Sequence, residues 1–134
     1  MELTFNIDAP LDSVYEYLTD MQKFVAVHPV INKIDRVLGN NYLVHETLKF
    51  CGIPFAFTYP ATIAQNYNDR KIQMHASVMR LTKIEMNYTL SANNNMTTVN
   101  ETITFSSPLP IKRIMAGIFK KQHTLLFKNI DDAV

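Results

Sequence analysis

The sequence predicts an α+β fold: a curved seven-stranded antiparallel sheet wrapped around a long C-terminal helix, with two short helices after the first strand. Residues 31–106 alternate between apolar and polar side chains, which is typical of strands with one dry and one wet face. Residues 110–134 carry apolar side chains at helical spacing and can bury that stripe across the dry face. At 134 residues, we expect one domain spanning 1–134.

The N-terminal segment predicts a strand followed by two short helices. Residues 2–8 alternate as a strand does, with Leu3, Phe5 and Ile7 on one face. A helix then begins at Asp8-Ala9-Pro10, where Asp8 can cap it and Pro10 suits its first turn. A second helix from about Asp20 must end before Pro29. We expect these helices to form a clasp beside the sheet.

Six further strands follow, and four of the breaks between them are turns at residues 39–41, 51–54, 68–69 and 93–95. A two-residue loop at Asn68-Asp69 pairs Ile63 with Met74, which keeps apolar residues on one face. A three-residue turn at 39–41 pairs Ile34 with Glu46. A register that pairs Leu90 with Val99 puts Tyr88 opposite Glu101.

The C-terminal helix carries two apolar stripes. The first, expected to face the sheet, is Ile111, Ile114, Met115, Ile118, Gln122, Leu125 and Leu126. The second is Phe119, His123, Phe127 and Ile130. The second stripe either covers the clasp helices or serves as a protein contact.

The order of strand, two short helices, six strands and long helix resembles the START-like helix-grip superfamily (SRPBCC). The opening FNIDAPLDSVYEYLTD, residues 5–20, looks like the family's strand-then-helix start. The superfamily includes pollen-allergen-like lipid-binding proteins and polyketide cyclase/dehydrase-like proteins. The resemblance implies a cavity between sheet and long helix that takes an apolar or amphipathic small molecule. The glycine-rich loop of the plant allergens has no counterpart, because Gly39-Asn40-Asn41 is a simple turn.

Two carboxylates, Glu46 and Glu101, interrupt the apolar face. Burial would raise the pKa of either one and suit it to acid–base work. The structural alternative is neutralisation: Arg36 lies diagonally from Glu46 in the expected register, and the Tyr88 hydroxyl could donate to Glu101.

The first functional hypothesis is binding of an apolar or amphipathic small molecule between the sheet and the last helix. The predicted ligand contacts are Glu46, Phe57, Tyr59, Met74, Met86, Tyr88, Glu101, Ile103, Met115, Ile118 and Gln122. A second hypothesis is a cyclase/dehydrase-type enzyme with Glu101 as acid/base assisted by Tyr88. It requires Glu101 to be free of a cation and reachable from the cavity. A third is an interaction module without ligand, or a homodimer, that docks through Phe119, an exposed Phe127 and nearby lysines of the C-terminal helix.

Composition excludes several classes. A net charge of +1 gives no reason to expect nucleic acid, and no stretch is long enough for membrane insertion. The four histidines show no metal-ligand spacing, and Cys51 is the single cysteine. We therefore expect no metal, no cofactor and, without a signal peptide, a cytoplasmic protein.

Overall fold

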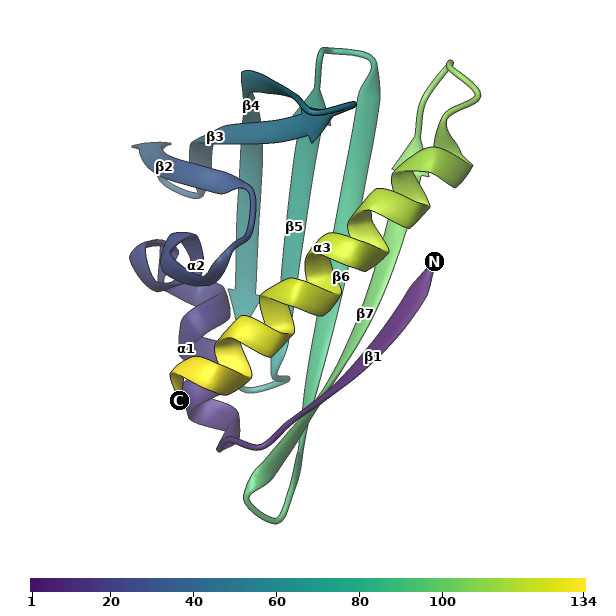
Figure 1. The fold of residues 1–134 in the computed structure, drawn as a ribbon. Helices are drawn as coiled ribbons and strands as arrows, with labels where there is room; N and C mark the ends of the chain where they lie inside the picture. The colour runs from purple at the N-terminus through teal and green to yellow at the C-terminus, as the bar shows by residue number, and fades with distance from the viewer.

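The computed structural model describes the backbone of residues 1–134 and the side chains of residues 1–49 and 51–134. The elements are β1 (Glu2–Ile7), α1 (Leu11–Thr19), α2 (Met21–Val27), β2 (Ile31–Leu38), β3 (Asn41–Phe50), β4 (Ile53–Asn66), β5 (Lys71–Val78), β6 (Thr82–Asn93), β7 (Met96–Ser106) and α3 (Lys112–Ala133). The strands form one antiparallel sheet in the order β1-β7-β6-β5-β4-β3-β2. α3 crosses one face of it (Figure 1). The predicted fold class is confirmed.

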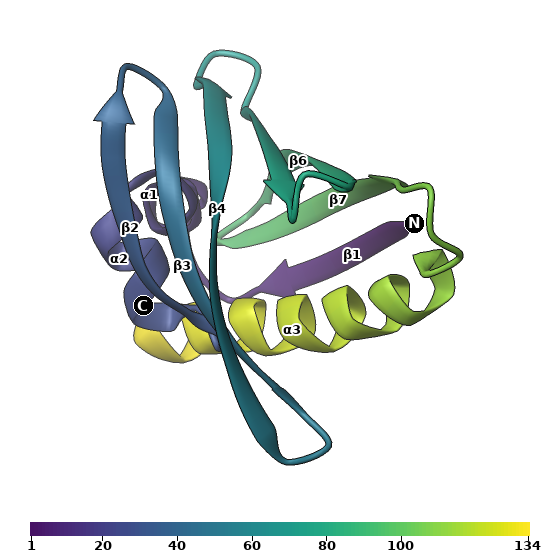
Figure 2. The same ribbon diagram turned by 90° about the horizontal axis from the view of Figure 1, so that it is seen from above.

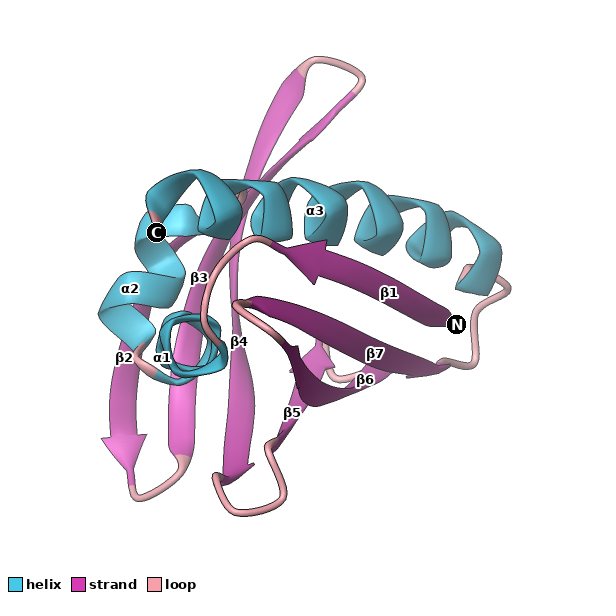
Figure 3. Cartoon of the chain, turned by 90° about the horizontal axis from the view of Figure 1, so that it is seen from below, coloured by secondary structure: helices cyan, strands magenta, loops and turns pink.

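The sheet is curved, so β2, β3 and β4 are turned relative to β7 and β1 (Figure 2). α1 and α2 lie near the C-terminal end of α3 (Figure 3), where Asn129 Nδ2 donates to the Val27 carbonyl oxygen at 2.8 Å. The main core joins α1, the sheet and this end of α3 through fully buried Val14, Leu18, Val99, Leu126 and Ile130. No helix in the described chain is long and apolar enough to cross a membrane.

Some of the predicted strand registers are confirmed and one is wrong. The pairs Ile63–Met74, Leu90–Val99 and Tyr88–Glu101 are confirmed. The predicted β2–β3 register is wrong, because Ile34 pairs with Val44 rather than with Glu46. The turn contains two residues instead of three, and edge strand β2 has irregularities between residues 31 and 33 and between 36 and 38. Such bulges insert unpaired residues and shift everything beyond them.

The new register moves Arg36 away from Glu46. Arg36 pairs with Tyr42, and its Nε donates to the Gly39 carbonyl oxygen at 2.9 Å. Gly39 adopts φ +56° in this turn, a conformation that glycine reaches without steric cost. The predicted neutralisation of Glu46 by Arg36 is therefore wrong.

The face of α3 that meets the sheet also differs from the prediction. Ile114 and Leu125, both in the first stripe, are 59% and 44% exposed. Leu126 of the same stripe is fully buried, and the second stripe also meets the sheet: Phe127 stacks on Phe5 of β1 at 4.4 Å between ring centroids, and Phe119 packs on Phe105 of β7 at 5.3 Å. Aromatic side chains bury the largest apolar areas, so the orientation that buries them is favoured. The hypothesis of an interaction module required an exposed Phe127, but Phe127 is only 2% exposed.

The predicted cap of the first helix is wrong, and the second helix, predicted to start near Asp20, is capped by Asp20 itself. Asp20 accepts from the Gln22 and Lys23 backbone N–H groups at 3.0 and 3.3 Å, which satisfies donors that the first turn leaves free. α1 begins after Pro10 without a side-chain cap. Asp8 instead donates its backbone N–H to Asp131 Oδ1 at 2.9 Å, which ties the end of β1 to the end of α3.

Candidate functional site

Two small cavities lie between the dry face of the sheet and α3. One, of ≈ 50 Å³, is lined mainly by β3–β6, the start of β2 and the middle of α3. The other, of ≈ 80 Å³, lies toward the N-terminal half of α3. The two meet at four residues that line both: Glu46, Tyr59, Phe119 and Gln122. This junction puts a carboxyl, a hydroxyl and an amide into otherwise apolar walls.

The structure brings most of the predicted ligand contacts to these cavities. Met74, Met86 and Tyr88 line the first, Phe57, Met115 and Ile118 line the second, and Glu46, Tyr59 and Gln122 line both. Glu101 and Ile103 line neither, and each is only 1% exposed. Strand parity placed them on the correct face but could not show how closely α3 packs over them.

Glu46 of β3 and Tyr59 of β4 form a hydrogen-bonded pair at the junction. Tyr59 is opposite Val44, two residues from Glu46, a diagonal separation that long side chains can span. The Tyr59 hydroxyl donates to Glu46 Oε1 at 3.0 Å. Burial raises the pKa of Glu46, an effect that the Tyr59 bond and the charge of His123 oppose. Burial and the neighbouring Glu46 carboxylate raise the pKa of Tyr59.

Glu101 of β7 is bound to His123 of α3. The His123 Nδ1 atom lies 2.6 Å from Glu101 Oε2 and 2.7 Å from Oε1. Glu101 is 1% exposed and His123 is 2% exposed. Glu101 therefore meets neither condition for a free acid or base, since it is paired and lies outside the cavity lining. Tyr88 donates to Met86 Sδ at 3.7 Å. Burial, followed by the charge of Glu101, raises its pKa well above the usual range.

His123 is one of the site residues that sequence reasoning missed, together with Phe119 and His28. It lines the smaller cavity, although its place in the second stripe set it apart from the expected pocket. One signal for it existed: a carboxylate on a buried apolar face needs a cation or several donors, and His123 is the ionisable member of that stripe.

His28, at the end of α2, is a second histidine in the smaller cavity. Its Nδ1 accepts from the backbone N–H groups of Val30 and Ile31 at 3.3 and 3.2 Å, so the proton of the neutral ring is on Nε2. Burial, with a smaller contribution from the charge of His123, lowers its pKa to about 3. At neutral pH His28 is therefore an uncharged donor.

No family model matches the chain, and no curated protein matches it in sequence. Solved structures do match. Ara h 8.0201 has 17% identity and a TM-score of 0.79, with 99% of this chain and 95% of that chain covered. The Zhui aromatase/cyclase from Streptomyces sp. R1128 has 13% identity and a TM-score of 0.75, over 99% and 91%. A START superfamily protein from Mycobacterium smegmatis has 11% identity and a TM-score of 0.74, over 100% and 98%. The chain has the helix-grip fold. At these identities the likeness concerns the fold.

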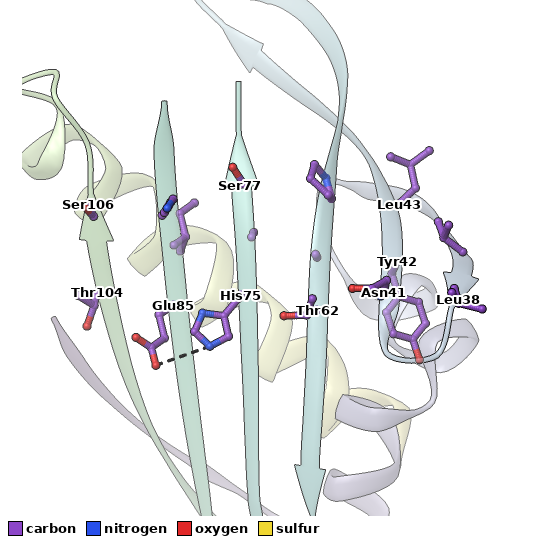
Figure 4. Close-up of a pocket in the computed structure, with 16 residues that line it drawn as sticks. Leu38, Asn41, Tyr42, Leu43, Thr62, His75, Ser77, Glu85, Thr104 and Ser106 are labelled. Atoms are coloured by element: carbon purple, nitrogen blue, oxygen red, sulfur yellow. Dashed lines mark ion pairs between the residues drawn. The ribbon is translucent and has the colours of Figure 1, made fainter. Parts of the chain in front are cut away.

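A hollow larger than either inner cavity lies on the opposite, wet face of the sheet (Figure 4). It measures ≈ 780 Å³ and is lined by polar side chains of β4–β7, such as Thr62 and Ser77, and by apolar ones, such as Leu38 and Leu43 of the β2–β3 hairpin. His75 and Glu85 lie within it at 3.8 Å, and Leu38 on its rim is 76% exposed. Because this hollow is open to solvent, it offers a ligand far less desolvation than the inner cavities do.

The inner cavities of the helix grip contain one carboxylate and little positive charge. Among the side chains that the structure describes, no lysine or arginine lines either cavity. The described residues also contain no group of three histidine, cysteine, aspartate or glutamate side chains that could hold a metal ion. The polar groups available there for hydrogen bonding belong to Glu46, Tyr59, Gln122, His28 and His123.

Proposed function

We propose that this protein binds a small apolar or amphipathic molecule in the two cavities between the sheet and α3. The observation that carries the proposal is the junction of the cavities. There Glu46, Tyr59 and Gln122 supply polar groups inside walls made of methionine, aromatic and aliphatic side chains. An apolar enclosure with a few convergent polar groups is the usual form of a small-molecule site.

The size and composition of the cavities indicate the kind of ligand. Volumes of ≈ 50 and ≈ 80 Å³ are far below the roughly 300–1,000 Å³ of drug-sized pockets. The ligand is therefore small, or α3 moves outward to admit it. Met74, Met86 and Met115 line these walls, and the flexible methionine side chain adapts to ligands of different shape.

Ligand extraction tests the proposal directly. The purified protein is denatured in organic solvent and the released small molecules are identified by mass spectrometry. We expect a compound in roughly stoichiometric amount that is absent from a refolded, delipidated sample. A delipidated protein that neither carries nor rebinds any apolar compound would contradict the proposal.

A matched pair of variants locates the binding. Ile118 lines the larger cavity, whereas Ile114, one turn earlier, is 59% exposed. Ile118→Phe should fill the cavity and reduce binding of an apolar fluorescent probe such as ANS, while Ile114→Phe should leave it unchanged. Equal binding by the two variants would place the ligand elsewhere.

Proton-transfer catalysis is a second candidate, and the geometry of His123 favours it. Because Glu101 holds Nδ1, the catalytic atom would be Nε2 on the other side of a ring that lines the cavity. The base would remove a proton from the carbon beside a ketone carbonyl and return a solvent proton. Deuterium exchange into 2-octanone, followed by NMR, tests this: it should be faster with wild type than with His123→Gln, and equal rates would exclude it.

A further inference from the structure

The electrostatics of the cavity junction select the head group of the ligand. Glu46 uses Oε1 to accept from Tyr59, and no described residue donates to its Oε2. Oε2 is also absent from the fully enclosed polar atoms that lack a partner. Glu46 therefore presents an acceptor oxygen that remains available where the two cavities meet.

The three histidines near Glu46 do not pair with its carboxylate. His123 is bound to Glu101 at 2.6 Å, so its Nδ1 is not available to pair with Glu46 or with a ligand. His28 is an uncharged donor because its Nδ1 accepts two backbone N–H groups. His75 also contributes to the lining but lies 3.8 Å from Glu85 on the wet face. The charge that a ligand meets at the junction of the two cavities is therefore set by Glu46.

The charge of a ligand's head group decides whether the Glu46 carboxylate attracts or repels it. A carboxylate would bring a second negative charge into a buried site, and like charges there disfavour each other strongly. A protonated amine would pair with the Glu46 carboxylate, which already lost much of its hydration when the protein folded. The resulting hydrogen bond is charge-assisted and therefore stronger than one between neutral groups. A hydroxyl group would donate one neutral hydrogen bond to the same oxygen.

We infer that the inner site selects small amphipathic molecules with a hydrogen-bond-donating head, amines before alcohols, and rejects those with a carboxylate. The donor binds Glu46 Oε2 beside Gln122, and the apolar part extends along Met74 and Met86 or along Met115 and Ile118. This inference rests on the proposed function and specifies its ligand class.

Three probes with one tail and different heads test the inference: octylamine, 1-octanol and octanoate, each titrated into delipidated protein at pH 7 by calorimetry. We expect octylamine to bind about tenfold or more tightly than octanoate, with 1-octanol between them. Octanoate binding as tightly as octylamine would overturn the inference and leave the proposed function intact. If none of the three probes binds, the inference fails, and the proposed function fails with it only if ligand extraction also yields no apolar compound.

In the variant Glu46→Gln the amide oxygen still accepts from Tyr59, and an NH2 donor replaces the charged acceptor Oε2. The hydroxyl of 1-octanol can accept from this NH2, whereas an ammonium group, which only donates, loses its partner. The variant should weaken octylamine about tenfold and change 1-octanol by less than about twofold. Glu2→Gln makes the same change in net charge at an exposed position of β1 and should bind all three probes as wild type does. Retention of the full octylamine preference by folded Glu46→Gln would contradict the inference.

Discussion

His123 Nδ1 lies within 2.7 Å of both carboxylate oxygens of Glu101, so one buried imidazole joins α3 to the centre of β7. The side chains are 3% and 0% exposed. A pair of this kind is coupled: the two groups together are tolerated, but either group alone is a buried charge or donor without its partner.

The free-energy costs of removing the two members should therefore not be additive. Glu101→Leu and His123→Leu should each lower the free energy of unfolding by about 3–5 kcal/mol. The double variant should lose less than the sum of the two, because it leaves no orphaned polar group. Urea denaturation of the four proteins gives the coupling energy, and additive losses would show that the pair contributes nothing as a pair.

A solvent-exposed pair provides the contrast. His75 and Glu85 on the wet face are 3.8 Å apart with side chains 51% and 37% exposed. His75→Leu should change the free energy of unfolding by less than about 1 kcal/mol.

Tyr59→Phe should raise the pKa of Glu46 further. The Tyr59 hydroxyl stabilises the ionised carboxyl, so its bond lowers a pKa that burial raises, and without the bond only the effect of His123 opposes burial. Carbon NMR of the Glu46 carboxyl across a pH titration measures the change. Tyr42→Phe is the control, since Tyr42 makes no side-chain hydrogen bond with any residue the structure describes, and it should leave the titration unchanged.

His28 should make the folded state less stable in acid. Its pKa falls from 6.5 to about 3 in the folded protein, so below pH 6.5 the unfolded chain binds a proton that the folded chain does not. The stability that neutral His28 provides is complete above pH 6.5 and is lost as the pH falls toward 3, at up to about 1.4 kcal/mol per pH unit.

The variant His28→Asn isolates this effect, because its amide oxygen can accept from Val30 and Ile31 but does not titrate. The difference in unfolding free energy between wild type and His28→Asn should change in favour of the variant between pH 6.5 and 4. Other groups, including Glu46 with its raised pKa, are common to both proteins and cancel. Parallel pH profiles would mean that His28 is protonated in the folded state.

The sheet could be read from the sequence wherever turn length and side-chain alternation agree. Asn68-Asp69 is such a place, and the pair Ile63–Met74 follows from it. The pair Leu90–Val99 follows from the alternation, since the turn after β6 has two residues rather than the predicted three. The same alternation put Glu46 and Tyr59 on the inner face, which is why they meet at the cavities. β2 lies at an edge, where bulges are tolerated, and its apolar pattern carries no sign of where they occur.

The rotation of α3 could not be read in this way. Its two stripes are adjacent, so a small turn about the helix axis exchanges them, and the choice depends on which partners the sheet offers. Phe5 and Phe105 offer aromatic faces to Phe127 and Phe119, and Glu101 offers a carboxylate to His123. These contacts involve residues far apart in the chain, so local periodicity contains no record of them.

Substitution of Phe127 and Leu125 tests the observed rotation. Phe127 is 2% exposed and stacked on Phe5, whereas Leu125 is 44% exposed. Phe127→Ala should lower the free energy of unfolding by about 3–5 kcal/mol through lost burial and an unfilled cavity. Leu125→Ala should cost less than about 1 kcal/mol, since most of what it removes is already hydrated. Urea denaturation measures both, and a larger loss for Leu125→Ala would mean that Leu125, not Phe127, is buried against the sheet in solution.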